Sequence, residues 1–114
     1  MLPRENRIVK KEDFEKIKRE GSSVKNPFFL TLFLQRGDGK PSRFGFIVSS
    51  KISKRAVDRN RVKRLLRIAI GNLISDIRED YDIIFIARKN VLLLDKEIFF
   101  SKVAESLRKK NILK

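Results

Sequence analysis

The residues best able to do chemistry in this sequence form one basic run. Between residues 54 and 70, seven of the seventeen residues are Lys or Arg and one, Asp58, is acidic. A guanidinium is planar, meets two phosphate oxygens at once and keeps its charge at any physiological pH. Asn60 adds amide groups that suit a base edge or a ribose hydroxyl. The chemistry that this run predicts is electrostatic binding of a polyanion.

A long helix is the element that would position the run. The apolar residues from 62 onward follow a period of 3.6, which predicts a helix over residues 54–77. The apolar stripe consists of Val62, Leu65, Leu66, Ala69, Leu73 and Ile77. Roughly opposite lie Asn60, Lys63, Arg64 and Arg67, with Arg59 and Arg61 flanking them. Burial of the stripe would therefore turn the cations outward.

A solvated, salt-bridged helix face is the alternative interpretation of the same run. It is disfavoured because acidic residues four positions away are scarce. Cations near a helix N-terminus also oppose the helix dipole, so a polyanionic partner explains their presence better than folding does.

The whole chain is basic as well. Twenty-eight Lys and Arg against 14 Asp and Glu give 114 residues a net charge of +14, which favours a nucleic-acid partner for one domain over residues 1–114. The absence of Cys and His excludes thiolate or imidazole metal sites and the corresponding nucleophiles and bases. The acidic residues are scattered, without the convergence that two-metal hydrolysis needs. We predict no catalytic residue and no metal ligand in this chain.

The remaining elements point to an α+β fold, a two-layer α/β sandwich. We expect helices over residues 10–20 and from Asp95 to about residue 110, and strands over residues 28–34, 43–49 and 81–87. Residues 22–25 are a candidate for a fourth strand. A turn over residues 36–41 would join the first two long strands as a hairpin, and the long helix would link the second to the third across one face of the sheet.

The aromatic residues admit two interpretations. Five of them could form a stacking platform for single-stranded RNA, but we expect at least three to be core residues: the five are Phe28, Phe29, Phe33, Phe44 and Phe46. Phe14 is the better stacking candidate, because its helix is otherwise polar. Gly45, in the middle of a predicted strand, indicates the close approach of another group.

The basic run resembles the signature of the bacterial ribonuclease P protein family: Arg59-Asn60-Arg61-Val62-Lys63-Arg64-Leu65-Leu66-Arg67. Similarity extends over nearly all of residues 6–110, including the stretches 6–8, 43–49 and 81–88. The resemblance implies a fold with a left-handed βαβ crossover, which the usual handedness of such units would argue against. It also implies a subunit of an endoribonuclease that removes the 5′ leader of precursor tRNA, in which the RNA subunit and its Mg²⁺ are the catalyst.

The resemblance assigns two sets of binding residues. The residues expected to bind the catalytic RNA are Lys54, Arg55, Arg59, Asn60, Arg61, Lys63, Arg64 and Arg67. Those expected to contact the leader, in a cleft between the sheet and the first helix, are Phe14, Lys18, Lys51, Arg88 and Lys89. Two positions depart from the family pattern. One helical turn after Phe14, where the family often has a second aromatic residue, this chain has Lys18, so a phosphate contact would replace a base stack. Before the signature, this chain has Ser49-Ser50-Lys51 in place of the family's Ser-Lys-Lys, which is one cation fewer.

Other functions remain open at the level of the sequence. A ribosome-associated or general RNA-binding protein would suit the same basic helix, and selectivity for its RNA would distinguish it. DNA binding is less favoured, because no helix-turn-helix or zipper pattern accompanies the helix. The start of the chain has no apolar segment typical of a secretion signal, and the longest apolar run is too short to span a bilayer. We therefore expect a cytoplasmic protein that needs RNA partners but no protein partner and no membrane.

Overall fold

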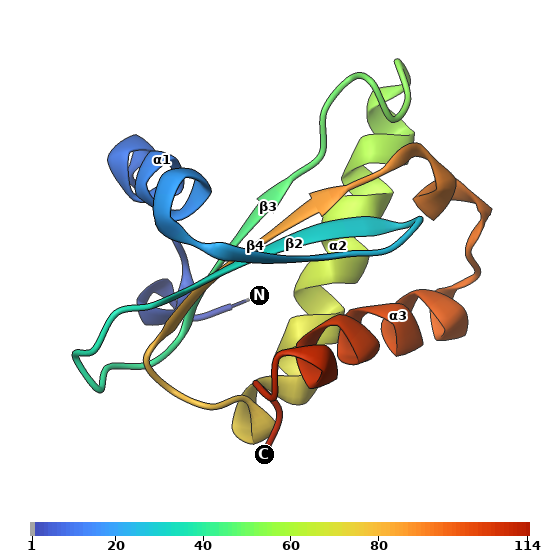
Figure 1. The fold of residues 1–114 in the computed structure, drawn as a ribbon. Coiled ribbons are helices and arrows are strands. Elements are labelled where there is room, and N and C mark those ends of the chain that lie inside the picture. Colours follow the sequence, from blue (N-terminus) through green and yellow to red (C-terminus); the bar gives the residue numbers. More distant parts are fainter. Residues whose placement is uncertain (1) are drawn as a thin grey trace.

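The computed structural model describes residues 2–114 as a four-stranded sheet with helices on both faces (Figure 1). The α-helices are α1 (Lys11–Glu20), α2 (Ala56–Leu73) and α3 (Lys96–Lys109), and the strands are β1 (Ser22–Lys25), β2 (Phe29–Gln35), β3 (Arg43–Ile47) and β4 (Tyr81–Ala87). Short 3₁₀ turns are η1 (Arg4–Asn6), η2 (Ile74–Asp76) and η3 (Lys89–Leu93). The predicted α+β class is confirmed, and so is the fourth strand at residues 22–25. No helix in this part of the chain has the length and hydropathy needed to cross a bilayer.

The strand order is β1-β2-β4-β3, so the expected hairpin between β2 and β3 is wrong. β4 lies between them, antiparallel to β2 and parallel to β3. Its middle residues Ile83 and Ile84 point to opposite faces and are both fully buried, so β4 is apolar on both sides and requires a central position. The predicted connection of β3 to β4 by the long helix is confirmed; the left-handed crossover stays a prediction.

The larger core fills the space between the sheet and the pair α2 and α3. Phe29 packs edge-to-face against Phe85 and Phe99, with ring centroids 5.8 and 5.4 Å apart. Phe33 and Phe44 are also buried in this core. Three of the five candidate aromatics are therefore core residues, as expected, and Phe28 and Phe46 are half-buried at its edge.

α1 covers part of the opposite face. Ile17 is fully buried there against Leu32 and Ile84, and Phe14 packs beside them. The helix ends where Gly21 meets the sheet: a Cβ at Gly21 would lie 2.7 Å from the carbonyl oxygen of Phe33 and 2.6 Å from that of Ile17. The predicted helix stop is therefore enforced by close packing.

A buried carboxylate fastens α1 and the β2–β3 loop to the sheet. Asp82 is 3% exposed and accepts hydrogen bonds from Arg36 at 2.6 Å and from Arg43 at 2.7 and 2.8 Å. Arg43 also reaches Asp13 of α1 at 3.4 Å, and Arg36 reaches Asp38 of the loop at 3.0 Å. Because a carboxylate can accept several charge-assisted bonds, one buried anion, through Arg36 and Arg43, holds the β2–β3 loop and α1 in place on the sheet.

α2 is shorter than the sequence predicted. It begins at Ala56, because Ser53 Oγ accepts the N–H of Arg55 at 3.1 Å and donates to Asp58 at 2.8 Å, which forms a turn ahead of the helix. It ends at Leu73, and the chain then passes through η2 into extended backbone at Ile77. The predicted apolar stripe is buried at Val62, Leu65, Leu66 and Ala69, and Ile70 joins it. For α3, the predicted cap is confirmed: Asp95 accepts the N–H of Ile98 at 2.9 Å.

Candidate nucleic-acid interface

A basic ridge runs along the solvent side of α2. We use this name for Arg59, Asn60, Arg61, Lys63, Arg64 and Arg67. Asn60, Arg64 and Arg67 are exposed, and Arg59, Arg61 and Lys63 are half-buried. Since Val62, Leu65, Leu66 and Ala69 are packed into the core, the backbone beneath these cations is fixed. The ridge is therefore a rigid row of positive charge.

The cations of the basic ridge have no carboxylate partner in the part of the chain that the structure describes. Among the described residues 2–114, none of the ridge cations forms an ion pair. Arg59 donates to the carbonyl oxygen of Ser53 at 2.8 Å, which holds its guanidinium against the start of the helix. The cations are free to neutralise an external anion.

Lys54 and Arg55 lie just before α2 rather than on it, which corrects the helix predicted to begin at residue 54. Lys54 is exposed, and the side chain of Arg55 is 75% exposed with its Nε 4.0 Å from Asp58. An ion pair this exposed contributes little. Both residues extend the positive surface beyond the N-terminus of the ridge.

The predicted leader-contacting residues come from three segments. Phe14 and Lys18 lie one turn apart on α1. Lys51 follows β3, and Arg88 and Lys89 follow β4. Because β3 and β4 are parallel, with Ile47 paired to Ile86, both strands end at the same edge of the sheet. The fold therefore brings Lys51 to the edge where Arg88 and Lys89 lie.

Part of the sheet face that carries α1 is left open. Leu30, Ile47 and Ile86 are half-buried there, and strand alternation places Arg88 on the same side as Ile86. Sequence reasoning missed Lys25, an exposed residue of β1 that is paired with Leu30 and therefore faces the same way. We call these five residues the open sheet face. Alternation would have indicated Lys25 only if the register of β1 had been known.

A further space between α1 and the sheet, lined from Asp13 to Glu20 along the helix, is unlike a leader site. A pocket there is lined by Asp13, Glu20, Asp38 and Asp82, and its Arg residues are already bound to carboxylates. With Lys16 included, the lining has four carboxylates against three cations, so the pocket disfavours phosphate. The open sheet face is the better candidate for contact with a single strand.

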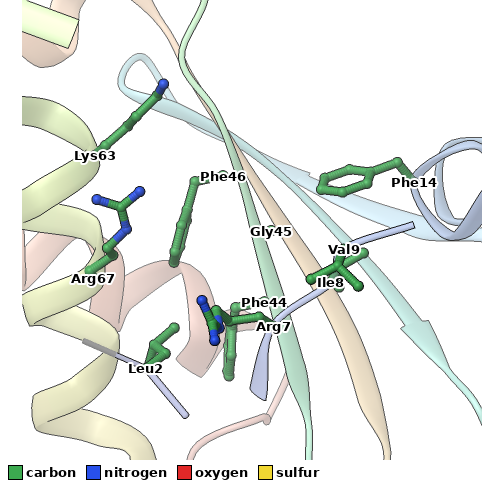
Figure 2. Close-up of a pocket in the computed structure, with 10 residues that line it drawn as sticks. All are labelled: Leu2, Arg7, Ile8, Val9, Phe14, Phe44, Gly45, Phe46, Lys63 and Arg67. Atoms are coloured by element: carbon green, nitrogen blue, oxygen red, sulfur yellow. The ribbon is translucent and has the colours of Figure 1, made fainter. Parts of the chain in front are cut away.

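Another hollow, which we call the notch, lies between the basic ridge and the N-terminal segment (Figure 2). Its volume is about 340 Å³, and it is lined by Leu2, Arg7, Ile8, Val9, Phe14, Phe44, Gly45, Phe46, Lys63 and Arg67. Arg7 reaches this position because it forms a parallel bridge with Phe44, at the outer edge of β3. No signal in the sequence links Arg7 to α2, since the pairing is made through the fold.

The acidic residues of the described chain lie apart or are already partnered. Within residues 2–114, no three carboxylates gather closely enough to hold an ion. Asp13 and Asp82 are occupied by Arg43, and Asp58 by Ser53.

Comparison with known proteins agrees with this arrangement. Residues 2–111 match the family model described as Ribonuclease P. The chain is 35% identical to the ribonuclease P protein component of Brevibacillus brevis, over 99% of this chain and 89% of that protein. It is 36% identical to the corresponding protein of Clostridium botulinum, over 96% and 97% of the two chains.

Solved structures give the same result. The ribonuclease P protein of Staphylococcus aureus superimposes with a TM-score of 0.88 at 29% identity, covering 96% of this chain and 98% of that one. The protein from Thermotoga maritima gives 0.81 at 30% identity, covering 90% and 96%. Matches over almost the full length favour a ribonuclease P protein over a ribosome-associated module. The chain belongs to the ribonuclease P protein family and is a subunit of the tRNA-processing endoribonuclease that works with the ribonuclease P RNA.

Proposed function

We propose that the basic ridge binds the catalytic RNA and that the open sheet face, with Phe14 and Lys18 of α1 beside it, binds the 5′ leader of precursor tRNA. The single observation that carries the proposal is the ridge, whose cations are fixed by a buried helix face and form no ion pair among the described residues. Each cation that neutralises a phosphate releases counterions, which favours binding. Lys54 and Arg55 would add contacts at the start of α2, and Lys51 and Lys89 at the edge of the sheet.

The basic ridge is better explained by RNA than by folding. Arg59 lies in the first turn of α2 and Arg55 directly before it, where the helix dipole disfavours positive charge. A bound phosphate reverses this cost, because it is attracted to both the cations and the helix N-terminus. RNA binding and the stability of α2 are therefore coupled.

The open sheet face suits a single strand more than a duplex. Leu30, Ile47 and Ile86 offer half-buried apolar surface to bases, and Lys25 and Arg88 offer charge to the backbone between them. Bases of a single strand are free to contact such a surface, whereas bases of an A-form duplex are enclosed in a groove that side chains read poorly. An unpaired leader meets this requirement.

The chain itself supplies binding and orientation in the cleavage reaction. Mg²⁺ held by the RNA subunit supplies the Lewis acid and the activated water. The protein lowers the electrostatic repulsion between two RNA molecules and holds the leader on a fixed surface. Because the catalyst and substrate are made in the cytoplasm, we assign the protein to that compartment, with no further protein partner required.

The experiment that tests the proposal is a binding titration of the ribonuclease P RNA with Arg64→Ala and Arg67→Ala. Both side chains are exposed on the ridge, so their removal leaves the core intact. We expect each variant to weaken binding by about tenfold and to reduce the slope of log K against log salt by about one, as for the loss of one phosphate contact.

Arg108→Ala is the matched control, since it removes an equally exposed guanidinium from the last turn of α3. It should leave the affinity within about twofold, because distant exposed charges are screened at physiological salt. Equal losses in all three variants would mean that the RNA responds only to net charge, and the proposed ridge would be wrong.

A further inference from the structure

We propose that the notch holds one unpaired nucleotide of the catalytic RNA, with its phosphate between Arg7, Lys63 and Arg67 and its base against Phe46. This inference rests on the proposed function and extends it to a site beyond the basic ridge. It assigns an RNA-binding role to Arg7, at the other end of the sequence from the signature.

The charges of the residues that line the notch favour an anionic ligand. Three of its ten lining residues are cationic and none is acidic. Arg7 and Arg67 are exposed, Lys63 is half-buried, and no salt bridge among the described residues involves any of the three. In Figure 2, Arg67 and Lys63 extend from α2 toward β3, and Arg7 faces them from the N-terminal segment. Cations from two separate elements therefore line the same hollow.

The volume of the notch and the side chains that line it fit a single nucleotide. A volume of about 340 Å³ is at the small end of ligand pockets, which span roughly 300–1,000 Å³. Phe46 is half-buried, its ring centroid lies 6.4 Å from that of Phe85, and its side chain lines the notch. An aromatic ring beside a cluster of guanidinium groups is the arrangement that recognises unstacked bases and their phosphates.

The notch adjoins the basic ridge, which indicates which RNA provides the nucleotide. Lys63 and Arg67 belong to both the ridge and the notch, so RNA lying along α2 passes the mouth of the notch. The open sheet face, by contrast, is formed by side chains on the other side of β3 from Phe46. Phe14, which we place beside the leader, also lines the notch, but two of the three cations of the notch belong to the basic ridge, so the occupant that we assign is the catalytic RNA.

The first test compares Arg7→Ala with Arg4→Ala in binding to the ribonuclease P RNA. Arg4 is exposed in the same N-terminal segment but does not line the notch, so the two variants lose the same charge. We expect Arg7→Ala to weaken binding by about tenfold, as for loss of one charged hydrogen bond, and Arg4→Ala by about twofold or less. Equal affinities for the two variants would overturn the proposal.

Arg64→Ala in the same assay separates this proposal from the one on which it rests. If Arg64→Ala weakens binding and Arg7→Ala does not, the notch is wrong and the ridge stands. If neither weakens binding, the proposed function fails as well.

The second test locates the nucleotide. The chain has no Cys, so Val9→Cys creates a unique thiol at a position that lines the notch and is 64% exposed. A photocrosslinker on this thiol should label one or two unpaired nucleotides of the RNA subunit in the holoenzyme. Leu93→Cys, 80% exposed and outside the notch, is the control and should not label them. Labelling of paired RNA, or of the leader of bound precursor tRNA, would overturn the assignment.

The third test concerns the base. Phe46→Leu keeps apolar contact with Phe85 but removes the flat ring, and an unchanged melting temperature would show that the core is intact. We expect about fivefold or greater loss of RNA affinity, as for loss of one stacked base. Wild-type affinity for Phe46→Leu would reduce the notch to a phosphate contact and would exclude the stacked base.

Discussion

The ring of Phe14 packs directly against Gly45 of β3, in the space that a Cβ would take at that position. An ideal Cβ on Gly45 would be 2.6 Å from Cε1 and 2.7 Å from Cζ of the Phe14 ring. The glycine therefore lets α1 approach the sheet and fixes the ring at the edge of β3. Phe14 is half-buried in this position, so part of the ring is still open to a ligand.

Phe14 is the residue with which the leader surface can be tested. Phe14→Leu keeps apolar volume over Gly45 and removes the aromatic face. We expect it to weaken binding of leader-bearing precursor tRNA by about fivefold or more, as for loss of one base stack, and to leave binding of mature tRNA unchanged. Affinities of the holoenzyme for both ligands would be measured. Equal effects on the two ligands would remove Phe14 from the leader site.

At the scale of the element, the β2–β3 turn shows how carboxylates order a loop. Asp80 has a φ of 85° and accepts hydrogen bonds from the N–H of Gly39 at 2.9 Å, from the side chain of Gln35 at 3.1 Å and from the N–H of Asp38 at 2.7 Å. These bonds, that of Gly39 foremost, lower the pKa of Asp80. The Arg36 guanidinium lowers the pKa of Asp38 strongly in the same turn.

The lowered pKa values predict how stability depends on pH. A carboxylate whose pKa is lower in the folded protein adds stability that is complete above the unfolded value, near 4, and is lost as pH falls through the folded value. We expect Asp80→Asn to lower the melting temperature at pH 7, because asparagine tolerates the left-handed backbone but lacks the charge. The difference from wild type should shrink below about pH 4.

Thermal unfolding of both proteins between pH 2 and 7 would measure this effect. Asp76→Asn is the control, since it removes an exposed carboxylate outside the turn. A difference between wild type and Asp80→Asn that stayed constant over the whole range would show that the charge of Asp80 does not stabilise the turn.

At the scale of the whole molecule, a charge of +14 on 114 residues is the dominant physical property. The charge is unevenly neutralised: Asp82 and its partners neutralise one another inside the fold, whereas no carboxylate of residues 2–114 pairs with a cation of the basic ridge. Such a surface attracts RNA over distances of about a Debye length, roughly 8–10 Å at physiological salt.

The charge predicts a specific magnesium dependence. Divalent metal screens the repulsion between the RNA subunit and the precursor tRNA, and a bound polycation supplies part of the same screening. We expect the protein to raise cleavage of precursor tRNA by the RNA subunit at low Mg²⁺ and to change it much less at high Mg²⁺. Cleavage rates with and without protein over a magnesium series measure this. The isolated protein should cleave nothing, and an unchanged rate at low Mg²⁺ would contradict the electrostatic role.

The sequence determined the features that depend on neighbouring residues. The 3.6-residue period of Val62, Leu65 and Leu66 predicted both the buried side of α2 and the exposed basic ridge, because a helix turns each side chain by a fixed angle. Phe44 and Phe46 alternate with Gly45, so both lie on one side of β3, because successive side chains of a strand point to opposite faces. Gly45 indicated a close approach, although it did not identify Phe14 as the neighbour.

Only the tertiary structure decided which distant segments meet. The strand order, with β4 between β2 and β3, follows from the burial of both faces of β4, and local pattern favoured a hairpin instead. Arg7 reaches the notch because the N-terminal segment bridges to Phe44, and Lys25 reaches the open sheet face through its register with Leu30. Contacts of this kind are set by competition among all apolar faces for one core, and no period in the sequence encodes them.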